Sequence, residues 1–270
     1  MNKRVVIVTG GTSGIGKACA KVFGEAGASI VITGRNQELL DDTFREFFHA
    51  GIKVLALKAD ASVEADNQYM IDETLKHFGR IDVLINNAGI SMRAIFEELN
   101  LDVIRKVMDI NFYGAVYATK YALPHLIESK GTVVGISSIA GYRGLPGRTA
   151  YSASKFALNG FLEALRTELL HQKVNVLTVA PGFTASNIRQ TALTKDGSSQ
   201  AESPRDESAM MSADECAKHI FQAVLKRKKL LVLTQQGKLT VLMNKLFPVW
   251  MDKKVFDTMH KEPDSPLKTR

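Results

Sequence analysis

The sequence has few of the features that mark secreted, metal-binding or membrane-spanning proteins. Its 270 residues include only two cysteines, Cys19 and Cys216, whose separation fits neither a metal-binding motif nor a disulfide framework. No signal peptide precedes the first apolar run, and no apolar run approaches the length of a membrane span. These absences favour a cytoplasmic protein in a reducing compartment, with no bound metal.

The charge pattern argues against one further class of partner. The formal net charge is +7, and the most basic stretch, residues 226–229, is short. The basic residues form no stripe interleaved with aromatic side chains, so the pattern is not that of a nucleic-acid-binding protein. A short basic run is typical of a solvated helix end, and a phosphate or membrane contact is the alternative.

The sequence does contain a regular alternation of strand-like and helix-like segments. The apolar runs that predict buried strands are 5–8, 29–33, 53–57, 82–85, 132–136, 174–179 and 230–234. With 45% hydrophobic residues, a chain of this length can bury the core of one large domain. The alternation predicts an α/β fold over residues 1–234: a Rossmann-like, doubly wound parallel sheet of about seven strands with helices on both faces. Asn100 is expected to open one long helix that continues towards His125.

A glycine-rich turn lies between the first predicted strand and the first predicted helix. Residues 9–16 read Thr-Gly-Gly-Thr-Ser-Gly-Ile-Gly. Glycines let the backbone approach a pyrophosphate closely, and a helix N-terminus offers it free N–H groups and a positive dipole end. The position of the turn inside a strand–turn–helix unit favours dinucleotide binding over a purely structural turn.

The end of the second predicted strand indicates which dinucleotide binds. An acidic residue there would hold the ribose 2′-hydroxyl of NAD, whereas an arginine accommodates the 2′-phosphate of NADP. Gly34 fills the acidic position, and Arg35 follows it. Because the planar guanidinium suits a phosphate, the sequence favours NADP(H) over NAD(H). A solvent-facing arginine is the alternative explanation.

A tyrosine and a lysine are spaced to act on one substrate atom. Tyr151 and Lys155 are four residues apart in a predicted helix, so their side chains share one face. A nearby cation lowers the pKa of a tyrosine, which makes Tyr151 a candidate general acid or base. Ser138, which follows the strand at 132–136, can donate to the same substrate oxygen. Taken alone, a tyrosine and a lysine at this spacing are more often a surface pair on a helix, and only the rest of the chain favours the functional interpretation.

Polar motifs follow several predicted strands at what should be one edge of the sheet. Ligands of doubly wound sheets bind beyond the carboxyl ends of the strands. The motifs at those ends are the glycine-rich turn, Asp60, the Asn-Asn-Ala-Gly run at 86–89, Ser138 and Pro181-Gly182. Their convergence favours a functional site over separate structural explanations.

These motifs, in their order and spacing, resemble those of the short-chain dehydrogenase/reductase family. The matching features are Thr9-Gly-x-x-x-Gly14-Ile-Gly16, Asn86-Asn-Ala-Gly89, Asn111, Ser138, Tyr151-x-x-x-Lys155 and Pro181-Gly182. The resemblance extends to about Thr234. It implies hydride transfer between a nicotinamide cofactor and a carbonyl or alcohol.

The resemblance also implies a role for each matching residue. Tyr151 would protonate the carbonyl oxygen, and Ser138 would polarise it. Lys155 would lower the pKa of Tyr151 and bind the nicotinamide ribose, with Asn111 holding a water in a proton relay behind it. The implied cofactor contacts are Gly10, Thr12, Ser13, Gly14, Ile15 and Gly16 at the pyrophosphate, Arg35 at the 2′-phosphate, Asp60 and Ala61 at the adenine, Asn87, Ala88 and Gly89 along the adenosine ribose, and Pro181, Gly182 and Thr184 along the nicotinamide.

Two departures from common family patterns narrow the resemblance. Ser13 stands where many NADP-dependent relatives carry a basic residue, and the chain lacks the Asp-Gly-Gly ending of many ketoacyl-carrier-protein reductases and sugar dehydrogenases. The run Tyr151-Ser-Ala-Ser-Lys-Phe-Ala-Leu158 resembles the hydroxysteroid-dehydrogenase and lipid-ketone-reductase branch instead. It implies an NADPH-dependent reductase of a ketone or aldehyde on a lipid- or steroid-like substrate. An oxidative NAD(P)-linked alcohol dehydrogenase and a catalytically inactive cofactor-sensing protein are the alternatives.

The last third of the chain lies largely beyond the family motifs and contains the segments that differ most from them. Residues 185–211 are polar and lack a clear period, which is typical of a substrate lid or of a disordered connector. Ser212 and Glu215 form a capping box that opens a helix. Residues 235–260 place an apolar stripe among lysines, which predicts an amphipathic extension that joins the core or a dimer interface, roofs the pocket or touches a membrane surface. Residues 261–270 predict a flexible tail, and the family resemblance implies a homodimer or homotetramer.

Overall fold

Seven parallel strands form one sheet in the structure, a computed structural model that describes residues 1–185, 188–200, 210–262 and 264–268. The strands are β1 (Val5–Val8), β2 (Ser29–Gly34), β3 (Val54–Lys58), β4 (Val83–Asn86), β5 (Thr132–Ile136), β6 (Asn175–Ala180) and β7 (Leu230–Val232). Their order across the sheet is β3-β2-β1-β4-β5-β6-β7, and every neighbouring pair is parallel. The strand order reverses between β1 and β4, which is where doubly wound sheets bind ligands.

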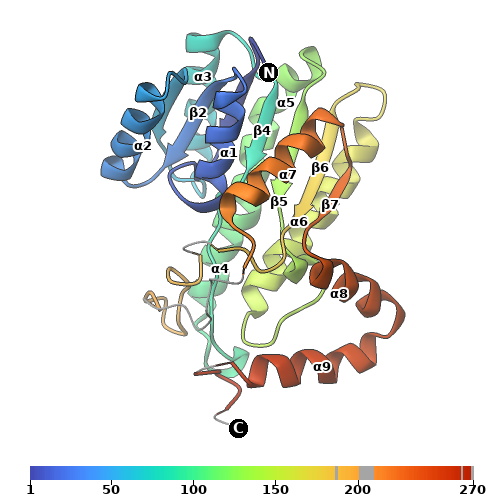
Figure 1. Ribbon diagram of the computed structural model, residues 1–270. Helices are drawn as coiled ribbons and strands as arrows, with labels where there is room; N and C mark the ends of the chain where they lie inside the picture. The colour runs from blue at the N-terminus through green and yellow to red at the C-terminus, as the bar shows by residue number, and fades with distance from the viewer. Residues whose placement is uncertain (186–187, 201–209, 263, 269–270) are drawn as a thin grey trace.

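Helices cover both faces of the sheet, as Figure 1 shows. The helices on one face are α1 (Gly14–Glu25), α2 (Gln37–His49) and α7 (Ala213–Leu225). Those on the other face are α3 (Glu64–Phe78), α5 (Gly114–Glu128) and α6 (Thr149–Glu168). The remaining helices are α4 (Leu101–Met108), α8 (Gln235–Leu246) and α9 (Pro248–His260). None of the described helices combines the length and the apolar character that crossing a membrane requires.

Successive residues of each strand enter the two cores in turn. Val6 and Val8 of β1 pack beneath α1 and α7, whereas Val5 and Ile7 belong to the core beneath α3, α5 and α6. Because both faces are covered, the strand reads as an unbroken apolar run instead of an alternating one. This arrangement confirms the predicted α/β fold.

Both cysteines lie in the first of these cores, Cys19 on α1 and Cys216 on α7, and both are free thiols. Burial raises the pKa of the Cys19 thiol well above its usual range and raises that of Cys216 to about 12. The thiols are therefore held in their protonated, unreactive form.

The long helix expected from Asn100 is interrupted. Asn100 does cap α4, since its side-chain oxygen accepts a hydrogen bond from the N–H of Asp102 at 2.8 Å. A π-helix at Asp109–Tyr113 then separates α4 from α5. Single π-turns of this kind are frequent at functional sites, and this one carries Asn111.

The C-terminal extension consists of two helices at the carboxyl end of the sheet, α8 and α9 (Figure 1). Arg143, in the segment after β5, donates to Asn244 of α8 at 3.0 Å and to Asp252 of α9 at 2.6 Å. Met251 and Val255 of α9 are buried in a small cluster against that same segment. The extension therefore packs beside the segment that leads to Tyr151.

Within the predicted flexible tail, 261–270, the structure describes 261–262 and 264–268, and Glu262 there is packed against the domain. Glu262 is only 5% exposed, and its carboxylate lies 3.3 Å from Arg148 and 3.6 Å from Arg93. The polar composition of this segment is typical of disorder, but composition does not show that Arg93 and Arg148, from distant segments, lie beside Glu262. The burial of this carboxylate depends on those partners.

Candidate active site

The glycine-rich turn joins β1 to the N-terminus of α1 at the point where the strand order reverses. Gly10 has a φ of +63° and Gly14 one of +50°, in the left-handed region that favours glycine. A Cβ on Gly16 would collide with the Gly10 carbonyl and the Asn87 amide. The first turn of α1 holds no acidic residue, and its N-cap, Ser13, makes no side-chain cap. The turn thus has the close backbone approach and the free helix N-terminus that a pyrophosphate needs.

The side chain of Asn87 holds this turn in place. Its amide nitrogen donates to the carbonyl oxygens of Thr9 and Gly10, both at 3.0 Å. The Thr9 hydroxyl in turn accepts from the backbone N–H groups of Asn87 at 3.0 Å and Ala88 at 3.1 Å. The turn and the segment after β4 therefore form one hydrogen-bonded unit. The sequence predicts Asn87 along the ribose, and in the structure its amide nitrogen is hydrogen-bonded to the turn.

Arg35 and Asp60 lie beside each other at the carboxyl ends of β2 and β3. Their side chains form an ion pair of 3.8 Å, and 58% of the Arg35 side chain is exposed. Asp60 also accepts from the N–H and hydroxyl of Ser62, at 2.9 and 2.7 Å. A Cβ on Gly34 would lie 3.0 Å from a carbon of Thr12, so the end of β2 closely approaches the turn. The guanidinium is held near the turn and remains open to a phosphate.

Lys155 is buried beneath the site on α6. Its ammonium donates to the carbonyl of Ile136 at the end of β5 at 2.9 Å, and it lies 5.7 Å from the centre of the Tyr151 ring. Only 3% of Lys155 is exposed, and burial lowers the pKa of its ammonium to about 8. A Cβ on Gly89 would lie 3.5 Å from the ammonium nitrogen. The glycine therefore keeps side-chain atoms out of the space beside this group.

The pKa of the Tyr151 hydroxyl is raised above its ordinary value, chiefly because the group is buried. A hydrogen bond with Ser138 and the positive charges of Arg189 and Arg148 act in the opposite direction. The structure differs here from the prediction that Lys155 lowers this pKa. Desolvation outweighs the opposing effects, and the charges that act on Tyr151 come from the two arginines.

Ser138 follows β5 and opens a short 3-10 helix, Ile139–Gly141. Its hydroxyl oxygen accepts from the N–H of Ala140 at 3.1 Å and also takes part in the hydrogen bond with Tyr151. The structure therefore brings Ser138, Tyr151 and Lys155 together at the end of β5, although the first and the last are 17 positions apart in the sequence.

Asn111, within the π-helix, connects three segments. Its Oδ1 accepts from the N–H of Ile90 at 2.8 Å, and its Nδ2 donates to the Ile90 carbonyl and the Ser154 hydroxyl, both at 2.9 Å. The Ser154 hydroxyl itself donates to the Tyr151 carbonyl at 2.8 Å. Both N–H bonds of the Asn111 amide are thus committed, and one Oδ1 lone pair remains to accept from a water.

Pro181, Gly182 and Thr184 lie beyond β6, adjacent to the segment that holds Ser138. The carbonyl of Pro181 accepts from the N–H of Ile139 at 3.2 Å. Thr184 is 4% exposed, and its carbonyl accepts from both terminal nitrogens of Arg189 at 3.1 Å. The segment assigned to the nicotinamide therefore also fixes an arginine whose charge acts on Tyr151.

The predicted substrate loop, 185–211, is described in part, because 186–187 and 201–209 lie outside the described residues. Leu193 exchanges backbone hydrogen bonds with Ser91 at 2.9 Å and Arg93 at 2.8 Å. The Leu193 side chain is buried in an apolar cluster against which Tyr151 packs. The described part of this loop thus contributes a buried apolar side chain beside Tyr151.

Two residues near Tyr151 do not appear among those predicted from the sequence, namely Arg148 and Arg189. Arg148 lies just before α6 and pairs with Glu262, and Arg189 is held by Thr184. Neither arginine belongs to a motif or a periodic pattern. Tertiary packing alone brings them to the site, so no local signal could have identified them.

The sheet order, the glycine-rich turn and the cluster around Tyr151 are those of a nicotinamide-dependent oxidoreductase. Residues 4–197 match the family described as short chain dehydrogenase. The chain belongs to the short-chain dehydrogenase/reductase family, whose members act on hydroxyl and carbonyl groups with nicotinamide cofactors.

Comparison with known proteins gives the same family. A mouse protein named dehydrogenase/reductase SDR family member 7B is 42% identical over 242 residues, which cover 87% of this chain and 74% of that protein. The 11-beta-hydroxysteroid dehydrogenase A of Arachis hypogaea is 34% identical over 256 residues, covering 91% and 72% of the two chains. These relatives confirm the resemblance to the hydroxysteroid-dehydrogenase branch.

A solved structure has the same fold. The crystal structure of a short chain dehydrogenase/reductase from Burkholderia phymatum in complex with NAD superimposes with a TM-score of 0.83 and covers 98% of both chains. Sequence identity is 22%, so this likeness concerns the fold alone.

Proposed function

We propose that this protein is an NADP(H)-dependent reductase of a ketone or aldehyde group on a hydrophobic, lipid- or steroid-like molecule. The observation that carries the proposal is the convergence of Ser138, Tyr151 and Lys155 at the end of β5, beside the glycine-rich turn. The protein is thereby assigned both a cofactor site and an acid/base group for the reacting oxygen.

In the proposed reaction the Tyr151 hydroxyl gives its proton to the substrate carbonyl oxygen, while Ser138 donates a hydrogen bond to the same atom. A bound nicotinamide supplies the hydride that the carbonyl carbon receives. The substrate gains one hydride and one proton and becomes an alcohol. The positive charges of Arg189 and Arg148, which act on the Tyr151 hydroxyl, stabilise the phenolate that remains on it.

The protonated state of Tyr151 is the one that the reductive direction requires. A tyrosine of ordinary pKa is already protonated at neutral pH, and burial shifts the pKa of Tyr151 further upward. An oxidative alcohol dehydrogenase would use the same residues in reverse and would need Tyr151 as a phenolate. An inactive cofactor-sensing protein would have no need of the three-residue cluster, which is intact here.

The end of β2 supports NADP(H) as the cofactor. Gly34 leaves no acidic side chain to hold a ribose 2′-hydroxyl, and the Arg35 guanidinium is open to a 2′-phosphate. Its present partner, Asp60, is 3.8 Å away, a weak and partly exposed ion pair. A 2′-phosphate would offer this arginine a stronger, bidentate partner.

Apolar surfaces near Tyr151 support a hydrophobic substrate. Leu193 and Met92 belong to the cluster that packs against Tyr151, and Met251 of α9 packs against the segment leading to it. The hydroxysteroid dehydrogenase of Arachis hypogaea is a relative whose name includes such a substrate. Apolar surroundings of the reacting group suit an apolar molecule.

The extension also supports contact with a membrane surface. The outer sides of α8 and α9 expose Leu242 (53%), Val249 (75%) and Trp250 (52%), among other large apolar side chains. Lys245 and Lys253 are exposed on the same helices. Apolar anchors among lysines are typical of helices that bind anionic lipid. The cytoplasmic location and the homo-oligomer remain predictions.

A substrate screen tests the proposal. Consumption of NADPH by the 270-residue protein is followed with ketones of increasing apolar surface, from acetone to a steroid ketone. We expect kcat/KM to rise with apolar surface and Ser138→Ala to lower it for every active ketone. Absence of NADPH consumption with every ketone, together with oxidation of the matching alcohols, would overturn the proposed direction.

A further inference from the structure

The turns that lead into β5, β6 and β7 each hold a basic residue in the left-handed backbone region. The φ angle is +51° at Lys130, +60° at Lys173 and +47° at Arg227. The turns that lead into β2, β3 and β4 use glycine for the same purpose: Gly27, Gly51 and Gly79. The turns before β5, β6 and β7 therefore use a basic residue at the position where the turns before β2, β3 and β4 use glycine.

A left-handed conformation costs free energy in any residue with a Cβ, which is why glycine usually follows a helix. Lys130 and Arg227 lie just beyond the ends of α5 and α7, where glycine is the usual choice. Together with Lys3, which precedes β1, the chain keeps four residues with a Cβ and a positive φ at this edge of the sheet, and all four are cations. Backbone strain that is retained in one place points to a function there.

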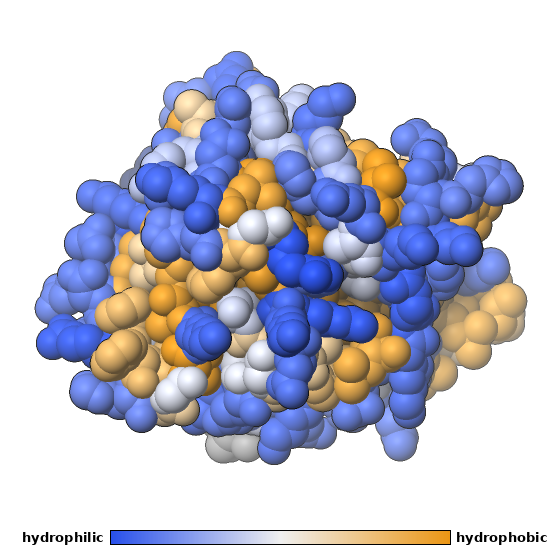
Figure 2. All heavy atoms as spheres, turned by 90° about the horizontal axis from the view of Figure 1, so that it is seen from above, coloured by the Kyte–Doolittle hydropathy of each residue, from blue (hydrophilic) through white to orange (hydrophobic). Residues whose placement is uncertain are grey.

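The three turns line a cavity of about 430 Å³. It lies at the amino ends of the strands, on the side of the sheet opposite the glycine-rich turn. Its cationic lining consists of Lys130, Arg166, Lys173, Arg227 and Lys229. Figure 2 views the molecule from this end and shows strongly hydrophilic side chains gathered near the middle of the face.

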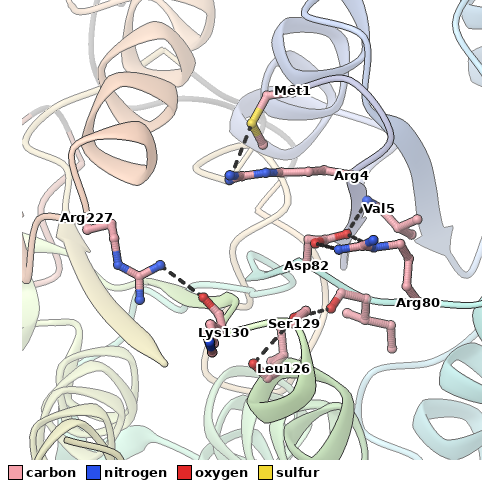
Figure 3. Close-up of polar contacts among 10 residues, drawn as sticks. Met1, Arg4, Val5, Arg80, Asp82, Leu126, Ser129, Lys130 and Arg227 are labelled. Atoms are coloured by element: carbon pink, nitrogen blue, oxygen red, sulfur yellow. Dashed lines mark hydrogen bonds and ion pairs between the residues drawn. The ribbon is translucent and has the colours of Figure 1, made fainter. Parts of the chain in front are cut away.

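Hydrogen bonds to the backbone hold two of the arginines in place. Arg227 donates to the carbonyl of Lys130 at 3.0 Å, as Figure 3 shows, and to that of Lys173. Arg166 donates to the carbonyl of Lys229 at 3.3 Å. A guanidinium has five N–H donors, so each arginine retains donors for a ligand. The site is therefore partly organised before anything binds.

No carboxylate of the described residues pairs with these cations. Within the part of the chain that the structure describes, none of the five forms an ion pair. The neighbouring Arg80 differs, because it is paired with Asp82 at 2.6 Å (Figure 3). The C-terminal ends of α5, α6 and α7 contribute only partial negative charges, about half a charge each. The cavity therefore carries a net positive charge.

We propose that this cavity binds a phosphate monoester, with the phosphate on Arg227 and the lysines and the organic part against Leu170 and Val174. Guanidinium groups match phosphate oxygens in pairs, and the lysines add charge. Leu170 is 60% exposed among the cations and offers an apolar surface to the ligand. The site is separate from the cofactor turn and does not depend on the proposed reductase activity.

The test uses substitutions that suit the backbone. The double variant Lys130→Gly/Lys173→Gly removes two charges and places glycine where φ is positive, so it should fold at least as stably as the wild type. Lys3→Gly is the matched control, because Lys3 also has a positive φ, +64°, but does not line the cavity. Lys229→Gln is a second variant that leaves the left-handed turns unchanged.

Two probes distinguish a soluble phosphate ester from a lipid headgroup. Glycerol 3-phosphate is titrated calorimetrically at constant ionic strength, and phosphatidylcholine vesicles are compared with and without phosphatidic acid in cosedimentation. We expect one probe to bind the wild type and the Lys3→Gly control equally, and the double variant and Lys229→Gln at least tenfold more weakly. Binding at the cofactor turn is the same in all four proteins and cancels in the comparison.

Three results would overturn the proposal. One is that neither probe binds the wild type. Another is that the double variant binds as tightly as the wild type. The third is that Lys3→Gly loses as much affinity as the double variant, because the effect would then be one of net charge and not of this cavity.

Discussion

The side-chain amide of Asn111 is hydrogen-bonded to both backbone groups of Ile90, at 2.8 and 2.9 Å. The π-helix is thereby fastened to the segment after β4, next to Gly89 and the Lys155 ammonium. Asn111 is thus a positioning residue in this structure. It sets where the backbone beside the lysine lies, in addition to any bond that it makes to water.

The first prediction follows from these two hydrogen bonds between Asn111 and Ile90. Asn111→Ala leaves the N–H and the carbonyl of Ile90 without their partner, so the free energy of unfolding should fall by about 2–4 kcal/mol. Asn100→Ala removes only an exposed helix cap and should cost about 1 kcal/mol. Urea denaturation measures both. Equal losses of unfolding free energy in the two variants would show that the Asn111 hydrogen bonds stabilise the protein no more than a helix cap does.

A second prediction concerns the buried ammonium of Lys155. Its pKa is lowered from 10.5 to about 8, so between these values the unfolded chain binds a proton that the folded chain does not. The free energy of unfolding should therefore rise with pH between about 8 and 10.5. Below about pH 8 the buried charge lowers the free energy of unfolding by roughly 3 kcal/mol. Lys155→Met removes this cost, but it also removes the hydrogen bond to the Ile136 carbonyl, which reduces the gain in stability by about 1 kcal/mol.

We therefore expect Lys155→Met to be inactive yet more stable than the wild type at pH 7, with a difference that shrinks towards pH 10. Melting temperatures at several pH values, without cofactor, measure this. Lys218→Met on the exposed side of α7 is the control and should show no pH-dependent difference. A Lys155→Met variant that is destabilised equally at all pH values would contradict the buried-charge explanation.

A third prediction concerns the choice of cofactor. Arg35→Ala should weaken NADPH binding by about 10- to 100-fold, the usual size of a charge-assisted contact, and leave NADH binding unchanged. Arg45→Ala removes an exposed arginine of α2 and should change neither. Intrinsic-fluorescence titration gives all six dissociation constants. Equal affinities of the wild type for NADPH and NADH would refute the phosphate assignment.

A fourth prediction concerns the thiols. Since burial raises the pKa of both Cys19 and Cys216, a thiol reagent at pH 8 should label neither in the folded protein and both in urea. Rapid labelling of the native protein would mean that α1 and α7 open readily.

The sequence identifies the fold and most of the site because the relevant signals are local. Unbroken apolar runs such as Val5–Val8 are typical of strands covered on both faces, and parallel strands bring their carboxyl ends to one edge. Ser138, Tyr151 and Lys155 could therefore be placed together from their positions after β5 and on α6.

Other features of the site depend on tertiary structure. The π-turn at Asn111 has no sequence period of its own, and the positions of Arg148 and Arg189 depend on loops that lack repeats. The raised pKa of Tyr151 depends on burial, whereas sequence spacing shows only that Lys155 is near. Glu262 looks like part of a polar tail until the guanidinium groups that surround it are known.

The central claim, acid catalysis by Tyr151, is tested most directly by Tyr151→Phe. With any ketone that the wild type reduces, kcat should fall at least 100-fold, the low end for loss of a general acid, while the dissociation constant for NADPH stays the same. Tyr69→Phe, at an exposed position of α3, should behave as the wild type. A Tyr151→Phe enzyme with kcat within a few-fold of the wild-type value would contradict the account.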